Sequence, residues 1–331
     1  MTARSEVQGN LGELPKAHLH LHLVGSMRPE TMVGLHAEAG IEVELAANFD
    51  DFGHFNDTYA LANSAIRSAD DLGRLVLEVL EDAKADGAVW VEPTLYLDSF
   101  KDVIGPGELI LEIATDALKS AREHLGIGAK LIVPAQRNLG PVDAVRQAQL
   151  AIRGDPDVIA GFGLVNFETD YPIEDFGEAI EIVSGAGLAF IPHAGEFLGP
   201  DQVALALEFG AARIAHGISA ARDAALMAKL ADRGVCLDVC PTSNVAVGQV
   251  ESLADHPLPI LLAAGVPISL GADDSLLFSC SLLSEYELAR SAFAFTDVQL
   301  ATIAEASIRH SIAPDHVKTS AVADVRAWLT A

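Results

Sequence analysis

Cysteine and basic residues are both scarce in this chain. The three cysteines (Cys236, Cys240 and Cys280) are too few for a disulfide framework, and none of them has the CxxC spacing of a metal knuckle. We interpret them as small core residues in a reducing compartment. Lys and Arg number 21 against 47 Asp and Glu, which gives a formal net charge of -26. Because this charge repels phosphate backbones and anionic membrane surfaces, we expect no nucleic-acid partner, and the acidity is that of solvated helix faces.

The sequence also lacks an apolar run long enough to cross a bilayer. Apolar stretches such as residues 260–264 end far short of the roughly 20 residues that a membrane span needs. The first residues, MTARSEVQGN, contain no basic stretch followed by an apolar run, as a secretory signal would. We therefore expect a cytoplasmic protein with no membrane association.

Short apolar or β-branched runs alternate with longer stretches of helical periodicity, which is typical of parallel βα units. Residues 175–184 and 223–233 have the apolar stripe of outer helices, and each ends at glycine. Eight such runs predict an α/β protein with a (β/α)₈ TIM-type barrel in a single domain, 1–331. The expected strands are residues 17–23, 88–95, 130–135, 158–165, 188–193, 213–216, 235–240 and 266–271.

The interval between the first two expected strands is too long for an ordinary βα connection. Residues 29–86 fill it and include the sequence FDDFGHFNDTY. We expect a helical insertion that covers the mouth of the barrel.

Metal-ligand side chains stand where the expected strands end. His20 and His22 lie two residues apart on the first strand, so the strand period turns both rings to the same side. His193 and His216 end two further strands, and Asp273 follows the last one. The carboxyl ends of barrel strands face one mouth, and His with carboxylate is a donor set that binds zinc while leaving a position for water. Isolated histidines are usually core or surface residues, but this many at strand ends predict a metal site.

Three further polar residues lie near these strand ends. Glu196, three residues after His193, can reach a substrate, although a surface glutamate would look the same. Asp274 is expected to point to the opposite side from Asp273 and to face the substrate. The alternative is that both carboxylates lie in a loop exposed to solvent. His18 lies one strand period before His20, deeper in the barrel, and we expect a structural role for it.

Taken together, these motifs resemble the adenosine deaminase family. PKAHLHLHLVGS is similar to its first-strand motif, HAGE to its fifth, AHG to its sixth, CPTSN to its seventh and SLGADD to its eighth, in family order from residue 15 to residue 274. The resemblance implies that His20, His22, His193 and Asp273 bind one zinc ion per chain. Zinc lowers the pKa of a coordinated water towards ~7.

The same resemblance assigns the chemical roles. It implies that Glu196 protonates the purine ring at N1, that His216 orients the attacking water and assists its deprotonation, and that Asp274 hydrogen-bonds N7. Gly163 is expected to contact the substrate, and Asn166, in GFGLVNFE, stands where the family often has a glycine near purine N3. Val24 replaces an aspartate that commonly contacts the ribose 5′-hydroxyl, and His18 replaces a more usual acidic residue.

The expected activity is hydrolytic deamination of a purine nucleoside, adenosine or 2′-deoxyadenosine, in a protein of undetermined oligomeric state. An apolar Val24 would also admit a 5′-modified adenosine such as 6-aminodeoxyfutalosine, and free adenine is a further alternative. Another class, the amidohydrolases that cleave esters or phosphotriesters, often bridges two metals with a carboxylated lysine, and no lysine ends the fourth expected strand. An inactive binding relative would be expected to lack a ligand or Glu196, and both are present.

Overall fold

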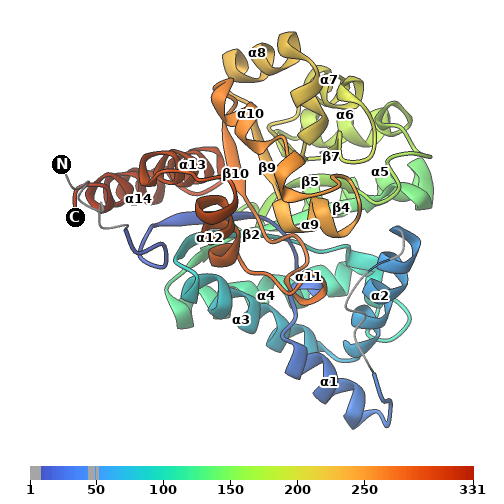
Figure 1. Cartoon of the computed structure of the whole chain (residues 1–331). Helices are drawn as coiled ribbons and strands as arrows, with labels where there is room; N and C mark the ends of the chain where they lie inside the picture. The colour runs from blue at the N-terminus through green and yellow to red at the C-terminus, as the bar shows by residue number, and fades with distance from the viewer. Residues whose placement is uncertain (1–8, 44–48, 50–51) are drawn as a thin grey trace, which may run out of the picture.

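A barrel of parallel strands forms the centre of the molecule (Figure 1). The computed structural model describes residues 9–43, 49 and 52–331. All eight expected strands are present, with ends that differ by at most two residues from the expected ones, although the fifth is divided. The strands are β1 (Lys16–His22), β2 (Ala88–Thr94), β3 (Gly128–Ala129), β4 (Leu131–Gln136), β5 (Ile159–Val165), β6 (Ala189–Phe190), β7 (His193–Ala194), β8 (Arg213–His216), β9 (Cys236–Val239) and β10 (Ile268–Leu270).

The wall consists of two ladders, β1-β2-β4-β5-β6 and β10-β9-β8-β7, that meet within the fifth expected strand. Residues 188–193 were expected to form one strand, but the structure divides this segment into β6 and β7. The division falls at Pro192, which has no N–H for a ladder. The Ile191 amide donates to the Phe162 carbonyl at 2.8 Å, and the Ala215 amide donates to the Pro192 carbonyl at 2.9 Å. The segment therefore still joins the two ladders.

The second seam lies between β1 and the residues that follow β10. The Asp273 amide donates to the His20 carbonyl at 3.1 Å, and the His22 amide donates to the Asp273 carbonyl at 2.9 Å. The wall is thus closed, as the (β/α)₈ barrel requires. Closure also places three of the expected ligand residues, His20, His22 and Asp273, on this seam.

Helices surround this wall, as Figure 1 shows. Residues 223–233 were expected to be helical, and α8 forms there because the Asp223 carboxylate accepts the amides of Ala225 and Leu226 at its start. In the expected helix 175–184, a 3₁₀ turn (Ile173–Phe176) precedes α6. The α-helices are α1 (Pro29–Glu38), α2 (Phe52–Ala65), α3 (Ala69–Ala85), α4 (Gly107–Leu125), α5 (Gly140–Arg153), α6 (Gly177–Gly185), α7 (Pro200–Glu208), α8 (Ala224–Arg233), α9 (Pro241–Ala246), α10 (Leu258–Ala263), α11 (Ser275–Phe278), α12 (Leu282–Ala292), α13 (Asp297–His310) and α14 (Asp315–Trp328).

Helices α1, α2 and α3 separate β1 from β2, which confirms the expected helical insertion. Helix α3 packs on α4 and β2 as an outer helix of the barrel. Helix α2 lies at the carboxyl ends of the strands (Figure 1) and contains most of the motif FDDFGHFNDTY. Within that motif, residues 50 and 51 lie outside the described part of the chain. The cover of the barrel mouth therefore comes from α2.

An ionic network is buried inside the barrel, below the strand ends. The Arg213 guanidinium lies 2.8 Å from carboxylate oxygens of both Glu92 and Asp238, and all three side chains are at most 1% exposed. Glu92 also accepts the indole N–H of Trp90, and Asp238 accepts the hydroxyl of Ser269. These hydrogen bonds offset part of the desolvation that burying three charges costs. The network ties β2, β8, β9 and β10 together beneath the barrel mouth.

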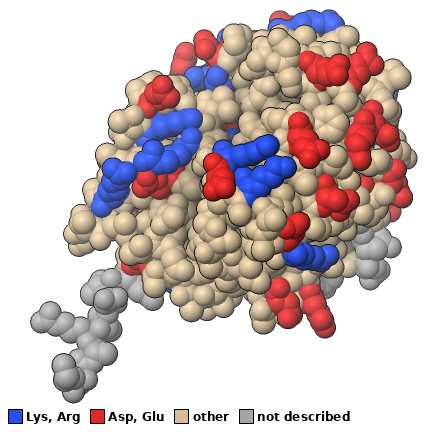
Figure 2. Space-filling view, turned by 90° about the horizontal axis from the view of Figure 1, so that it is seen from above, with Lys and Arg blue, Asp and Glu red and all other residues tan. Residues whose placement is uncertain are grey.

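The chain carries a formal net charge of -26. On the face in Figure 2, acidic side chains are widely spread, and basic side chains occur in small groups beside them. Within the described residues, no helix combines the length and the apolar character that crossing a bilayer requires.

The buried network yields a stability prediction. Arg213→Met removes the cation and leaves two carboxylates without it, so the free energy of unfolding should fall by about 3–5 kcal/mol. The matched control is Arg309→Met, which breaks an exposed pair with Glu305 four residues away and should cost roughly 0.5 kcal/mol or less. Urea unfolding followed by circular dichroism measures both. Equal stabilities for the two variants would contradict this account of the network.

Candidate active site

Four of the expected ligand side chains converge at the carboxyl end of the barrel. His20 Nε2 lies 3.2 Å from His193 Nε2 and 3.3 Å from Asp273 Oδ1, and His22 Nε2 lies 3.2 Å from the same oxygen. The donor atoms of His20, His22, His193 and Asp273 all lie within 4.8 Å of one another. This arrangement could hold a cation with nitrogen and oxygen ligands.

Neighbouring groups orient these side chains. The His20 Nδ1–H donates to the Asp238 carbonyl at 2.8 Å, since that oxygen can only accept. The proton of a neutral His20 is therefore on Nδ1, and the Nε2 lone pair faces the cluster. The Ser243 hydroxyl donates to Asp273 Oδ2 at 2.6 Å. One carboxylate oxygen of Asp273 thus faces His20 and His22 while the other is held by serine.

The backbone is strained at two of these positions. His216 has φ 61° and Asp273 has φ 58°, in the left-handed region that residues with a Cβ rarely adopt. Such conformations cost on the order of 1–3 kcal/mol each and persist where the surrounding structure enforces them. Here they occur at His216, the last residue of β8, and at Asp273, shortly after β10, where the side chains face the barrel mouth.

The same residues determine the electrostatics of the cluster. Burial works against the charged ring of His20, but the Asp273 carboxylate outweighs it and raises the pKa of His20. Burial would raise the pKa of Asp273, but the surrounding imidazoles, His20 first, hold it well below its usual range. Burial and then the neighbouring rings lower the pKa of His193. The cluster is therefore built around an ionised carboxylate.

Glu196 lies beside the cluster rather than in it. Its Oε2 is 3.5 Å from His216 Nε2, and its side chain is 10% exposed. Burial, followed by the carboxylates of Asp273 and Glu168, raises the pKa of Glu196 well above its usual range. Burial lowers the pKa of His216 to about 3. A protonated carboxyl next to a neutral imidazole can exchange a proton with a bound molecule.

Asp274 lies on the wall of the same space. Its carboxyl group packs against Gly25, where a Cβ would overlap the carboxyl, so only glycine fits there. Burial and the adjacent Asp273 raise the pKa of Asp274 well above its usual range. A buried carboxyl that keeps its proton can donate a hydrogen bond.

Glu168, which was not predicted from the sequence, shapes the loop that carries Glu196. Glu168 is 2% exposed, and its carboxylate accepts four consecutive backbone amides, those of residues 195–198, at 2.5, 3.1, 2.8 and 3.1 Å. Arg137, also buried, donates to the His193 carbonyl at 2.7 Å. Glu168 ends the segment GFGLVNFE, but its pairing with a loop 27 residues away leaves no local signal.

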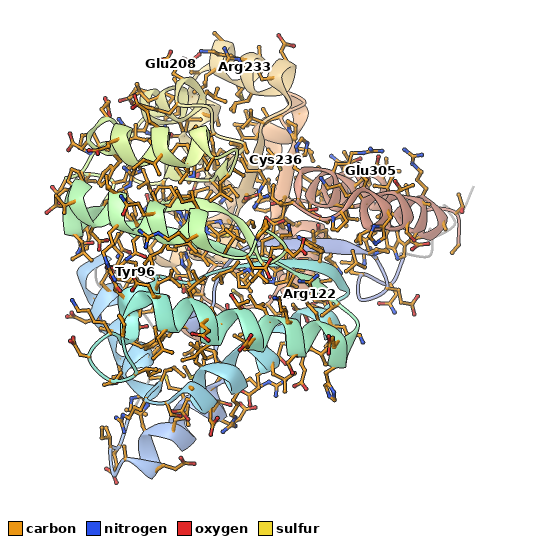
Figure 3. The ribbon with its side chains drawn as sticks, turned by 180° about the vertical axis from the view of Figure 1, so that it is seen from behind. Tyr96, Arg122, Glu208, Arg233, Cys236 and Glu305 are labelled. Atoms are coloured by element: carbon orange, nitrogen blue, oxygen red, sulfur yellow. The ribbon has the colours of Figure 1, made fainter. Side chains whose placement is uncertain are left out.

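A cavity of about 260 Å³ opens beside the cluster, and a smaller one of about 30 Å³ reaches the reacting groups. Both are lined by His22, Phe55, Val165, Asn166 and Asp274, so they adjoin. The larger cavity extends past α2 towards Tyr96, which lies after β2 on the α2 side of the barrel in Figure 3. The additional polar residues of its wall are Asn56, Tyr59, Asn63, Thr94, Ser99, Gln136 and Asn138.

Of the four expected substrate contacts, two line these cavities and two do not. Asn166 and Asp274 belong to both walls. Val24 is 1% exposed and lies in the 3₁₀ turn after β1, outside both linings. Gly163 is packed in β5, where an added Cβ would lie 3.1 Å from the Ile191 carbonyl. The side chains of α2, rather than Val24, form the wall at that end.

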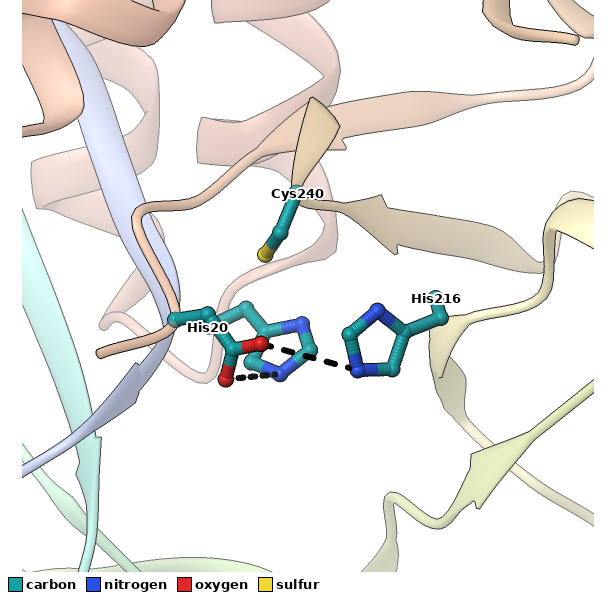
Figure 4. Close-up of side chains that lie close together, drawn as sticks. His20, His216 and Cys240 are labelled. Atoms are coloured by element: carbon teal, nitrogen blue, oxygen red, sulfur yellow. Dashed lines mark ion pairs between the residues drawn. The ribbon is translucent and has the colours of Figure 1, made fainter. Parts of the chain in front are cut away.

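Two residues outside the ligand set also lie close to it. His18 is 3% exposed, and its Nε2 accepts the Ala272 amide at 3.1 Å, which links β1 to the segment after β10. The thiol of Cys240 belongs to a second group of possible donor atoms with His20, His216 and Asp273. Figure 4 shows this group, with dashed lines from the Asp273 carboxylate to His20 and His216. Burial raises the pKa of the Cys240 thiol well above its usual range.

Comparison with known proteins places the chain in a family. It matches the model of the adenosine deaminase family over residues 15–328. A putative adenosine/adenine deaminase of Streptomyces virginiae is 41% identical over 96% of this chain and 97% of that protein. An aminodeoxyfutalosine deaminase of Acidothermus cellulolyticus is 32% identical over 92% of this chain and 89% of that protein.

Solved structures agree with this placement. An adenine deaminase from Arthrobacter aurescens superposes with a TM-score of 0.89 at 30% identity, covering 96% of this chain and 99% of that one. An amidohydrolase from Burkholderia ambifaria with bound Zn gives a TM-score of 0.85 at 25% identity, covering 99% of this chain and 96% of that one. The chain therefore belongs to the adenosine deaminase family and is a hydrolytic deaminase with a (β/α)₈ barrel fold.

Proposed function

We propose that the protein removes the 6-amino group of a purine nucleoside, adenosine or 2′-deoxyadenosine, with one zinc ion per chain. The observation that carries the reaction type is the meeting of a ligand cluster, Glu196 and His216 in one cavity. The observation that carries the nucleoside is the larger cavity beyond it, which is lined by neutral polar side chains.

The donor set fits zinc. His20 and His193 bring their Nε2 atoms to 3.2 Å, and the lone pair of His20 faces inwards because its other nitrogen donates to a backbone carbonyl. Two imidazole nitrogens and a carboxylate oxygen this close together suit a cation, and His22 completes the set. When bound, the metal would supply an activated water at neutral pH.

The chain's own residues would handle the protons. Glu196 would donate its proton to N1 of the purine as water attacks C6, which makes C6 tetrahedral. His216 would orient the attacking oxygen, from a nitrogen 3.5 Å from Glu196. Asp274, which keeps its proton, would donate to the lone pair of N7. One proton of the attacking water returns to the Glu196 carboxylate and the other passes to the amino group, so that the C6–N bond breaks, ammonia leaves and the 6-oxo purine remains.

The charge of the cavity favours a nucleoside over a nucleotide. Among the described residues, neither cavity is lined by Lys or Arg, so a 5′-phosphate would meet no cation. Free adenine is the second candidate, because the similar structure from Arthrobacter aurescens is named an adenine deaminase. A bare purine would leave most of the polar wall from α2 without a partner.

Asn63 is the residue of α2 best placed to meet a sugar hydroxyl. It lines the larger cavity, and its Oδ1 is buried with no hydrogen-bond partner among the described residues. A buried acceptor without a partner costs free energy, and a ligand hydroxyl would satisfy it. We propose that Asn63, rather than Val24, recognises the sugar.

The role of Glu196 can be tested by substitution. Glu196→Gln keeps the shape but removes the transferable proton, so kcat should fall by a factor on the order of 10² to 10⁴. Zinc content by metal analysis should not change, because Glu196 is not in the proposed ligand set. Glu178→Gln, on the exposed face of α6, is the matched control and should retain wild-type kcat. Loss of zinc from Glu196→Gln would assign it as a ligand instead.

Substrate choice can be tested through Asn63. Adenosine should have a higher kcat/KM than adenine or AMP in the wild-type protein, and Asn63→Ala should lower the adenosine value about three- to tenfold, the effect of one hydrogen bond. The adenine value should not change, since the base does not reach Asn63 in this proposal. The measurement is the loss of the adenine absorbance band.

Two outcomes of that assay would count against the proposal. A wild-type protein that acts on adenine but not on adenosine would replace the nucleoside with the free base. An equal loss for both substrates in Asn63→Ala would remove Asn63 from sugar recognition. The assay should include 5′-deoxyadenosine, because its kcat/KM relative to adenosine reports whether any residue binds the 5′-hydroxyl.

A further inference from the structure

A chain of buried hydrogen bonds leads from a backbone amide to His216. The Leu258 amide donates to Nδ1 of His256 at 3.1 Å. His256 Nε2 lies 3.2 Å from Asn244 Oδ1, and Asn244 Nδ2 lies 3.1 Å from Nδ1 of His216. His256 is 3% exposed, Asn244 0% and His216 1%, so water does not compete for these bonds.

The donor and acceptor of each of these hydrogen bonds follow from the first one, which the Leu258 amide makes. A backbone amide can only donate, so Nδ1 of His256 must accept and carries no proton. Burial lowers the pKa of His256 to about 4, so the ring is neutral near pH 7 and its single proton is on Nε2. That N–H donates to Asn244 Oδ1. The amide NH₂ of Asn244 then faces His216, and Nδ1 of His216 must accept.

The side-chain amide of Asn244 cannot exchange its oxygen and nitrogen positions without losing hydrogen bonds. Its backbone N–H donates to the Cys240 carbonyl at 2.9 Å, and its own carbonyl accepts the amides of Gln249 and Val250 at 2.9 and 3.1 Å. These bonds hold the backbone of Asn244 within α9. Rotating its side-chain amide would set NH₂ against the Nε2–H of His256 and oxygen against a nitrogen lone pair of His216.

We propose that Asn244 and His256 are positioning residues that hold His216 in the tautomer with its proton on Nε2. The hydrogen bond made by one ring nitrogen determines which nitrogen carries the proton. The Nε2 atom lies 3.5 Å from Glu196 Oε2 and 3.8 Å from Asp273 Oδ2, so His216 presents a donor to the reacting groups.

This inference changes the expected role of His216. A ring that carries its proton on Nε2 orients an oxygen by donating to it and has no lone pair there to accept the proton of the attacking water. That proton must go to a carboxylate instead, and Glu196, which becomes a carboxylate when it gives its proton to N1, lies 3.5 Å from His216 Nε2. The catalytic meaning of the tautomer rests on the proposed deamination, but the tautomer itself does not.

The direct test is nitrogen NMR of the zinc-loaded protein labelled with ¹⁵N-histidine. Ring ¹⁵N shifts distinguish protonated from bare nitrogens. In the wild type, His216 should have a bare Nδ1 and a protonated Nε2, and a protonated Nδ1 would overturn the proposal. This readout needs no substrate, so it remains valid if the protein deaminates none of the purines tested.

The second test is Asn244→Asp, a change of almost no volume that replaces the donor with an acceptor. Nδ1 of His216 should then become protonated, and a neutral ring would lose its proton from Nε2. The kcat should fall by about 10² or more, as a wrong tautomer does in the serine protease triad. KM should stay within about threefold, and the zinc content should not change.

The control is Asn10→Asp, the same exchange at an exposed position far from the mouth, which should leave both the NMR signals and kcat as in the wild type. An Asn244→Asp protein with Nδ1 still bare would overturn the proposal. So would one with Nε2 bare and wild-type kcat, because the donor would then have no part in turnover.

Discussion

The whole site depends on one close approach, that of His20 Nε2 to His193 Nε2 at 3.2 Å. The two residues lie 173 positions apart, on β1 and β7, which belong to different hydrogen-bonded ladders. Only closure of the barrel brings them together. Because Nδ1–H of a neutral His20 donates to the Asp238 carbonyl, the Nε2 lone pair faces His193, and a cation between the two Nε2 atoms would satisfy both.

Other parts of the structure hold this approach in place. The seam between β1 and Asp273 positions three of the four proposed ligands through backbone hydrogen bonds. Arg213 ties β8 and β9 together below the mouth, and Glu168 gathers four backbone amides so that Glu196 projects beside the cluster. The strained backbone at His216 shows that the position of the side chain is enforced by its surroundings.

Much of the fold and of the ligand cluster could be predicted from the sequence, because local patterns of residues indicate them. The two-residue period of β1 predicts that His20 and His22 share a side, and the structure places their ring centroids 5.9 Å apart. The alternation of strands and helices predicts the barrel, and the long interval before β2 predicts the insertion. Family motifs then predicted the activity, which the comparisons confirm at the level of the family.

What could not be predicted depends on contacts between distant segments. Glu168 pairs with a loop 27 residues away, and the bonds from Asn244 to His216 and His256 span 28 and 12 residues. The periodicity of apolar residues does not indicate hydrogen bonds between residues so far apart in the sequence. Val24 was expected at the sugar because of its place in a motif, but the 3₁₀ turn after β1 buries it, and α2 supplies the wall instead.

The most direct test of the central claim is X-ray absorption at the zinc edge of the purified protein. The account predicts one zinc per chain with only nitrogen and oxygen neighbours, at about 2.0–2.2 Å. A sulfur neighbour at about 2.3 Å would move the metal to the group that contains Cys240. A second metal at roughly 3.5–4 Å would indicate a two-metal site, and either result would contradict the proposed ligand set of His20, His22, His193 and Asp273.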